Sequence, residues 1–251
     1  HAFSRQQELD FLEARKLPVP PYGAAYSVNR GLWGVTIGGK ETLTSTGSIP
    51  DSAWVLSKDA FSKPRAATQH SIQFDEGRPV GVDGVQLSPV AVIEQLEALA
   101  APYGIGRGIH LGDTIIGTKG RVAFEAPAAE TLLVAHRELE KLVLTGRQQR
   151  IKESLAGPYG DWVHEGQLLD PVCRDIEALL VSSQERVTGT VHVTFRPGSL
   201  FVDGVDSVHS LMTASKGVYG EAAGEWTPAD ALGFSKIVSL TGMFHARAGR
   251  Q

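Results

Sequence analysis

The sequence has little cysteine, no excess of basic charge and no long apolar run. Its single cysteine, Cys173, cannot form an internal disulfide, which fits a reducing cytoplasm. The formal net charge of −4 gives no basic field that would recruit nucleic acid or an anionic membrane. No apolar run approaches the roughly 20 residues that span a bilayer. We therefore expect a cytoplasmic protein that binds no nucleic acid and no membrane, with Cys173 as a buried, inert thiol.

The amino-acid composition is typical of a globular protein. The chain has 251 residues, of which 42% are hydrophobic and 21% charged, enough for a sizeable core in one large domain or two smaller ones. It begins with His1 instead of methionine, and Phe3, Leu9 and Leu12 already have helical spacing. We therefore expect that residue 1 is not the natural start and that sequence upstream of it is missing.

Capping residues followed by apolar side chains at helical spacing predict six helices. Ser4 and Gln7 have the spacing of a capping box. Ser88 and Asp170 each precede a proline, which is the favoured first residue of a helix. The predicted helices cover residues 4–15, 88–101, 127–143, 146–156, 170–183 and 227–247. Residues 17–21, which are rich in proline, should be extended, and residues 20–25 should form a linker.

Alternating apolar and polar residues predict strands between these helices. Residues 71–75 alternate, and Asp83-Gly84 favours a type I′ turn between residues 80–82 and 85–87. Residues 187–195 alternate strictly and return after a turn at 200–202, as in a hairpin. A further short strand is expected at residues 54–56. Because helices and hairpins are mixed without a strand–helix–strand repeat, the fold class should be α+β.

Residues 104–127 combine six glycines with three basic side chains, one histidine and two carboxylates. Glycine lets the backbone approach another backbone or a ligand closely. One interpretation is a twisted hairpin with bulges and no further role. The other is a set of strands and tight turns that present polar groups to a ligand. Lys119 and Arg121 within this stretch are expected to be solvated or salt-bridged, with a phosphate or a neighbouring subunit as the alternative.

Two local patterns resemble functional sites but are better explained structurally. Residues 34–41 come close to a phosphate-binding loop, yet Glu41 stands where serine or threonine would ligate magnesium, and the following residues begin a helix poorly. We reject that interpretation. His136 lies beside the apolar stripe of a predicted helix without a histidine or cysteine three or four residues away. It should be a hydrogen-bonded histidine and not a metal ligand.

Six motifs occur in the order and at the spacings of a known family. They are residues 26–39, 104–107, 117–121, 124–125, 135–140 and 184–190. Together they resemble argininosuccinate synthase, and the resemblance covers nearly the whole chain. It implies ATP-dependent ligation, in which the ureido oxygen of citrulline attacks the α-phosphate of ATP and the aspartate amine then displaces AMP. The implied assembly is a homotetramer in the cytoplasm.

The resemblance also implies a division of the chain. Residues 1–21 would be the last helix and strand of an α/β nucleotide-binding domain, 22–225 the citrulline-binding synthetase domain, and 226–251 an oligomerisation helix. In the family, Mg-ATP is held mainly by an N-terminal Ser-Gly-Gly-x-Asp loop, which this sequence lacks. We therefore expect the chain alone to be inactive. The alternative is a non-catalytic module for ligand binding or assembly.

The citrulline site is carried over position by position. Ser27 matches the first citrulline-contacting serine of the family, and Thr36 falls on the second. The family's glutamate falls on Gly112, so Asp113 beside it is expected to take over the contact with the α-amino group. The family's tyrosine falls on Phe124, which keeps the ring and loses the hydroxyl. These departures indicate either a branch that binds citrulline differently or one with a changed substrate. We find no residue typical of a nucleophile or general base.

Overall fold

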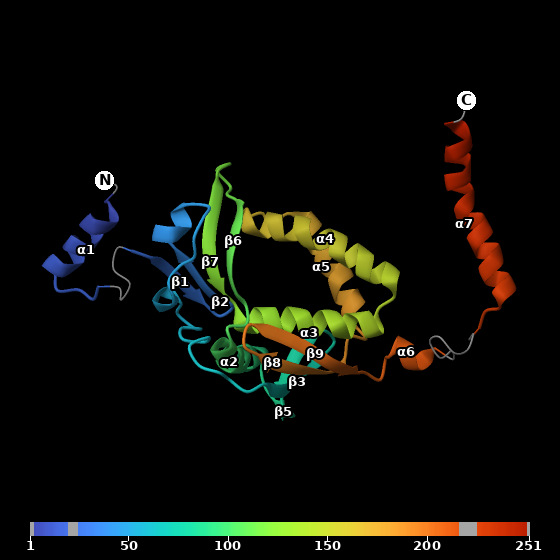
Figure 1. Cartoon of the computed structure of the whole chain (residues 1–251), viewed down its shortest axis with the longest axis horizontal. Coiled ribbons are helices and arrows are strands. Elements are labelled where there is room, and N and C mark those ends of the chain that lie inside the picture. Colours follow the sequence, from blue (N-terminus) through green and yellow to red (C-terminus); the bar gives the residue numbers. More distant parts are fainter. Residues whose placement is uncertain (1–2, 20–24, 216–224, 250–251) are drawn as a thin grey trace. The chain divides into compact units, whose positions relative to one another are not determined.

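The computed structural model describes residues 3–19, 25–215 and 225–249. The chain divides into two compact units, His1–His209 and Ser210–Gln251 (Figure 1). The predicted α+β class is confirmed, because the described residues form seven α-helices and two antiparallel sheets. The proposed division at residues 21 and 225 stays a prediction.

The first sheet has four strands in the order β1-β2-β7-β6. Its strands are β1 (Ser27–Gly31), β2 (Gly34–Gly38), β6 (Arg107–Asp113) and β7 (Lys119–Glu125). Each outer strand forms a hairpin with its inner neighbour, and β2 pairs with β7 along the middle. The glycine-rich stretch therefore contains a hairpin, which both interpretations of it allow. The β6–β7 register runs without a shift, so the expected bulges are wrong.

A long connection covers one face of the first sheet. Val35, Ile37 and Ala123 on that face are fully or almost fully buried against residues 49–56. The connection contains two short 3₁₀ helices, η1 (Lys40–Leu43) and η2 (Asp51–Ala53). The strand predicted at residues 54–56 is wrong. The backbone N–H groups of Val55 and Leu56 donate to a side-chain carboxylate instead of to a neighbouring strand.

The second sheet has five strands in the order β5-β4-β3-β8-β9. These strands are β3 (Thr68–Asp75), β4 (Arg78–Val82), β5 (Val85–Gln86), β8 (Gly189–Arg196) and β9 (Ser199–Asp206). The predicted type I′ turn is confirmed, because Asp83 and Gly84 have φ angles of 53° and 80° and Val82 pairs with Val85. The predicted hairpin of residues 187–202 is also confirmed by the β8–β9 pairing.

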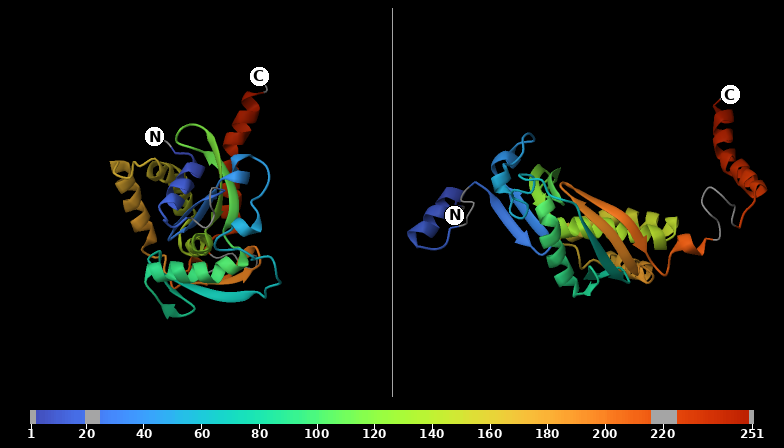
Figure 2. Two further views of the ribbon diagram at one scale, coloured as in Figure 1. Left: turned by 90° about the vertical axis from the view of Figure 1, so that its left-hand side faces the viewer. Right: turned by 60° about the horizontal axis from the view of Figure 1, so that its bottom comes forward.

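Two helices pack on the second sheet and on each other to form the larger core. They are α2 (Pro89–Ala100) and α3 (Pro127–Val143), and they lie beside β4, β8 and β9 (Figure 2). Ile72, Leu96 and Phe195 are fully buried between these layers. A 3₁₀ turn, η3 (Ala101–Tyr103), follows α2 and leads into β6. The two hairpins of the first sheet are thus attached to the larger core through α2 and α3.

The predicted caps mark helix starts accurately. Ser88 caps α2 and Asp170 caps α5 (Pro171–Gln184), as predicted. Thr145, which was not predicted as a cap, caps α4 (Gly146–His164). However, α4 does not end near residue 156 as predicted. It continues through Pro158, because the helix loses only one backbone bond there and Tyr159 is held to α5 by a 2.8 Å hydrogen bond to Glu177.

Three further helices complete the described residues. In α1 (Arg5–Ala14), Ser4 and Gln7 form the predicted capping box. Residues 17–19 are not a strand, and residues 20–24 of the predicted extended segment and linker lie outside the described residues. The second unit contains α6 (Leu211–Ala214) and α7 (Pro228–Ala248). Thr227, at which the predicted helix of residues 227–247 begins, caps α7. Among the described helices, none is long and apolar enough to cross a membrane.

Candidate ligand-binding face

Three of the four predicted site residues lie on the same face of the first sheet. Thr36 on β2 is directly opposite Phe124 on β7, and it is also opposite Asn29 on β1. Ser27 lies two residues before Asn29. Directly opposed residues in antiparallel strands share a face, and so do residues two apart along a strand. On β6 the same rule places His110 on this face. We call Ser27, Asn29, Thr36, His110 and Phe124 the open face.

The fourth predicted residue, Asp113, lies apart from the other three. It follows Gly112, which shares the parity of His110 and therefore belongs to the open face. Asp113 consequently points to the opposite side of the sheet, where its carboxylate forms an ion pair with Lys119. Its contact with a ligand stays a prediction, and the alternation of the strand argues against it. Gly112, where the family's glutamate would fall, offers no side chain.

The sequence analysis selected neither Asn29 nor His110 among the residues of the open face. His110 is the aromatic one of the two. Its ring lies edge-on to the ring of Phe124, with 5.4 Å between the ring centroids. The imidazole also lies above Gly108, since a Cβ placed there would be 2.8 Å from His110 Nε2. His110 could have been found in the sequence, because it lies two residues before Gly112 and residues two apart along a strand share a face.

A buried carboxylate fixes the strand that carries Phe124. Glu125 is fully buried and accepts hydrogen bonds from the backbone N–H groups of Val55 (2.6 Å), Leu56 (3.0 Å) and Ser57 (2.7 Å). The Ser57 hydroxyl donates a fourth bond at 2.6 Å. A carboxylate that accepts several N–H bonds is well satisfied without a cation. This residue was noted in the sequence only as part of a motif.

Two arginines attach the covering connection to the same sheet. The Arg107 guanidinium lies 4.1 Å from the centroid of the Trp54 ring and 2.7 Å from the Asp51 carboxylate. The hydrogen bond from Arg107, followed by one from a backbone N–H, holds the pKa of Asp51 below its usual range. Arg121 donates to the carbonyl oxygens of residues 41, 44, 46 and 47. Lys119 is salt-bridged to Asp113, as expected, whereas Arg121 is bound to backbone carbonyl oxygens and forms no ion pair with a described residue.

Residues 34–41, which the sequence analysis rejected as a phosphate-binding loop, are held by contacts within the chain. The Tyr26 hydroxyl donates to Glu41 Oε2 at 2.6 Å. Burial, together with this bond to a carboxylate, raises the pKa of Tyr26 to about 12, and the same bond lowers the pKa of Glu41. Residues 34–41 form a strand and a 3₁₀ turn with no α-helix after them, so the segment lacks the helix terminus that a phosphate loop requires.

The two remaining sequence candidates have structural roles, as predicted. His136 Nε2 lies 2.9 Å from Gln184 Oε1, and burial lowers the pKa of the imidazole. Cys173 is fully buried. In the described ranges, no group of three or more His, Cys, Asp or Glu side chains has the arrangement of a metal site.

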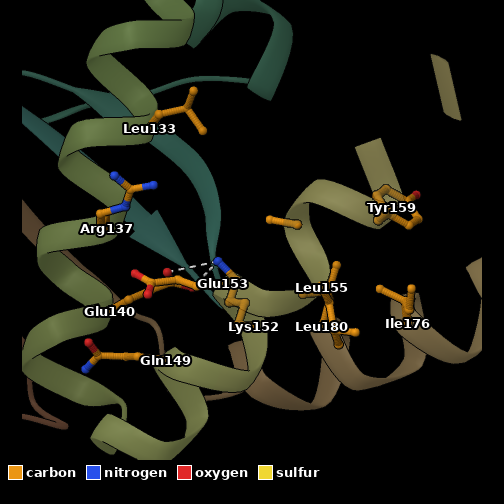
Figure 3. A pocket seen from close by; sticks show the side chains of 11 residues that line it. Leu133, Arg137, Glu140, Gln149, Lys152, Glu153, Leu155, Tyr159, Ile176 and Leu180 are labelled. Carbon is orange, nitrogen blue, oxygen red and sulfur yellow. Dashed lines mark hydrogen bonds and ion pairs between the residues drawn. The ribbon is translucent and has the colours of Figure 1, made fainter. Parts of the chain in front are cut away.

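A cavity of about 290 Å³ lies away from the open face, between α3, α4 and α5 (Figure 3). Leu133, Leu155 and Leu180 contribute to its apolar walls. At one side Lys152 Nζ is 2.7 Å from Glu140 Oε1, an ion pair that joins α3 to α4. None of the predicted site residues lines this cavity.

The fold places the protein in the class of mixed α+β domains. It is built on two antiparallel sheets, and one of them exposes a polar face. Comparison with known proteins then gives the family. Residues 26–245 match the family described as "Arginosuccinate synthase C-terminal domain". The chain therefore belongs to the argininosuccinate synthase family, of which it contains the C-terminal domain.

Similar proteins support this membership over the whole chain. The chain is 37% identical over 251 residues to the argininosuccinate synthase of Xanthomonas campestris pv. campestris, which covers 100% of this chain and 62% of that protein. It is 35% identical over 208 residues to that of Methanocaldococcus jannaschii, covering 83% of this chain and 52% of the relative. The chain thus spans between about half and two thirds of the length of these relatives.

Proposed function

We propose that this chain supplies the citrulline-binding face and an oligomerising helix of an argininosuccinate synthase. The complete reaction would join citrulline to aspartate at the expense of Mg-ATP in the cytoplasm, through a citrullyl-adenylate. The observation that carries the proposal is the convergence of Ser27, Thr36 and Phe124 on one sheet face. These residues come from three strands and were selected from the motifs alone.

The chemistry of the open face suits the polar end of an amino acid. The Ser27 and Thr36 hydroxyls and the Asn29 amide can donate to a carboxylate. The Phe124 ring offers an apolar surface for an aliphatic chain. Adenylyl transfer requires orientation of the ureido oxygen towards the α-phosphate more than it requires a protein nucleophile. In this proposal the nucleotide is bound mainly by an N-terminal domain that the chain does not contain.

Isothermal titration calorimetry, in which citrulline is added to the chain, tests the binding part of the proposal. We expect Ser27→Ala and Thr36→Val each to weaken binding about tenfold, because each removes a hydrogen bond to a charged group. The matched control is Thr190→Val on the second sheet, which should leave the affinity unchanged. If citrulline does not bind, or if the control weakens binding as strongly as Thr36→Val, the proposal fails.

A second candidate is a ligand-binding or assembly module without catalysis, and Gly112 favours it. To separate the two, the chain would be mixed with the N-terminal part of the Xanthomonas campestris relative and supplied with ATP, citrulline and aspartate. Release of AMP that requires both polypeptides and both amino acids supports the synthase. Citrulline binding without such release supports the module.

A further inference from the structure

A further cavity lies in the connection that leads from the first sheet to β3. Its volume is about 540 Å³, and it is lined mainly by the segment 56–65, with Pro102 of η3 on the other side. Among the described residues that line it, none belongs to the open face. We call it the basic cavity, because basic side chains dominate its charge.

Three cations line the basic cavity against one carboxylate. Lys58, Lys63 and Arg65 contribute the positive charges, and Asp59 contributes the negative one. Within the described parts of the chain, none of the three cations forms a hydrogen bond or an ion pair, although the Arg65 guanidinium lies 5.2 Å from the centroid of the Tyr103 ring. Cations that share one cavity repel each other, and a bound anion replaces that repulsion by attraction.

Hydrogen bonds within the connection fix the backbone of the basic cavity. The N–H of Ala60 donates to the Ser57 carbonyl at 3.1 Å, and the N–H and hydroxyl of Ser62 donate to the Asp59 carbonyl at 3.1 and 2.8 Å. The Asp59 N–H donates to the Asp51 carboxylate at 2.8 Å. Because these bonds are already formed, a ligand does not have to order the backbone when it binds.

The segment is also anchored at both of its ends. Its first residues are held by the buried carboxylate of Glu125. The Phe61 ring covers Gly104, where an added Cβ would lie 2.4 Å from Phe61 Cζ. The Tyr103 hydroxyl donates to the Ala66 carbonyl at 3.0 Å, just beyond the cavity. The three cations are therefore carried by a backbone that is fixed on both sides.

We propose that the basic cavity binds the phosphate group of a small anionic molecule. A phosphate group presents several acceptor oxygens, so that Arg65 can bind two of them at once while Lys58 and Lys63 act as point charges. A phosphate also carries enough negative charge to balance the excess of cations. The site is separate from the open face, so this inference does not depend on the proposed function.

Isothermal titration calorimetry with inorganic pyrophosphate at constant ionic strength tests the inference. The unmodified chain should show saturable binding. Lys63→Gln and Arg65→Gln should each weaken it about fivefold to tenfold, because each removes a charge-assisted contact. The matched control is Arg137→Gln on α3. This arginine is also exposed and unpaired among the described residues, but it lines the other cavity, so the affinity should not change.

Two variants that change the negative charge of the basic cavity separate a binding role from a structural one. Asp59→Asn removes the opposing carboxylate, and asparagine tolerates the φ of 61° at this position. It should tighten pyrophosphate binding about threefold, which a merely destabilised chain would not do. Ser62→Glu adds a carboxylate to the lining and should weaken binding by at least as much.

Parallel titrations with inorganic phosphate and AMP distinguish the sources of the phosphate group. Tighter binding of AMP than of phosphate supports a nucleotide ligand, and the reverse order supports an inorganic anion. The inference is overturned if none of the three compounds binds saturably, or if Arg137→Gln weakens binding as much as Arg65→Gln. Weaker binding by Asp59→Asn also overturns it. A failure of citrulline to bind the open face would leave it unaffected.

Discussion

At the scale of single residues, Glu125 shows how a charged group can be structural in a strand whose other face belongs to a candidate site. Four donors from residues 55–57 surround its carboxylate, which is fully buried. Glu125→Gln would turn an amide NH₂ towards donors that need an acceptor. We expect a loss of roughly 3 kcal/mol in the free energy of unfolding.

Denaturant titration measures this loss, with Glu94→Gln on the exposed side of α2 as the control. The control should change the free energy of unfolding by less than about 0.5 kcal/mol. Equal stability of the two variants would show that the four hydrogen bonds do not depend on the charge of Glu125.

His136 makes the stability of the larger core depend on pH. Burial against the Phe74 ring lowers the pKa of the imidazole, Glu140 opposes that shift, and Lys152 adds to it. Because the folded-state pKa lies below the unfolded value of about 6.5, the unfolded chain binds the proton more readily. The stabilisation is therefore present above pH 6.5 and is lost as the pH falls through the folded-state pKa.

The prediction is tested by comparing how the free energy of unfolding changes with pH in different variants. The unmodified chain should lose more stability than His136→Gln between pH 7.5 and pH 5.5, since glutamine keeps a polar contact with Gln184 but does not titrate. His192→Gln, on the exposed face of β8, controls for the removal of a histidine. A pH dependence of His136→Gln that matches the unmodified chain would contradict the prediction.

At the scale of elements, one glycine determines how the first sheet joins the helices. Gly106 precedes β6 with φ of 70°, and a Cβ there would lie 2.4 Å from the carbonyl oxygen of Ala126, the residue that leads into α3. The backbone N–H of Ala126 also donates to the Gly106 carbonyl at 3.0 Å. Gly106→Ala should therefore destabilise the fold by roughly 2 kcal/mol or more, through strain and steric conflict together.

Gly112→Ala is the matched control, because Gly112 lies on β6, the strand that Gly106 precedes, and the added methyl group meets open space. It should change the free energy of unfolding by less than about 0.5 kcal/mol. If Gly106→Ala changes the free energy of unfolding as little as Gly112→Ala, the prediction is wrong. The backbone between β6 and α3 would then accommodate a methyl group despite the short distance to the Ala126 carbonyl oxygen.

Helix starts and hairpin turns were predictable because their signals are local. Ser88, Thr227 and the Asp83-Gly84 turn need only a few neighbouring residues to act. The end of α4 and the segment 54–56 were mispredicted because distant partners decide them. Tyr159 bonds to α5, and the backbone of residues 55–57 bonds to Glu125, and neither partner can be recognised in the local sequence.

The candidate site was predictable only in part, for the same reason. The motifs selected Ser27, Thr36 and Phe124, but the pairing of β2 with β7 that brings them together joins segments far apart in the chain. Asp113 was predicted to replace a side chain at Gly112 because the two residues are adjacent in the chain. Adjacent residues of a strand point to opposite faces of the sheet, so Asp113 lies on the other face. His110 was passed over because its place on the open face follows from that alternation too.

At the scale of the whole molecule, the second unit presents a helix without internal packing. Within the second unit, no side chain of α7 is buried, and Phe234 and Ile237 are 69% and 71% exposed. These two and Val238 have the i, i+3, i+4 spacing of one helical face. Exposed apolar surface of this kind is typical of an interface with another chain.

We therefore expect the chain to self-associate through α7, in keeping with the homotetramer proposed for the family. Light scattering coupled to size exclusion should give a mass of several chains for the unmodified protein. The double substitution Phe234→Glu and Ile237→Glu should lower that mass, because it places charge on the apolar face. Lys236→Glu, on the same helix, should not. A monomeric unmodified chain would refute the assembly role of α7 directly, and an unchanged mass in the double variant would place the interface on another element.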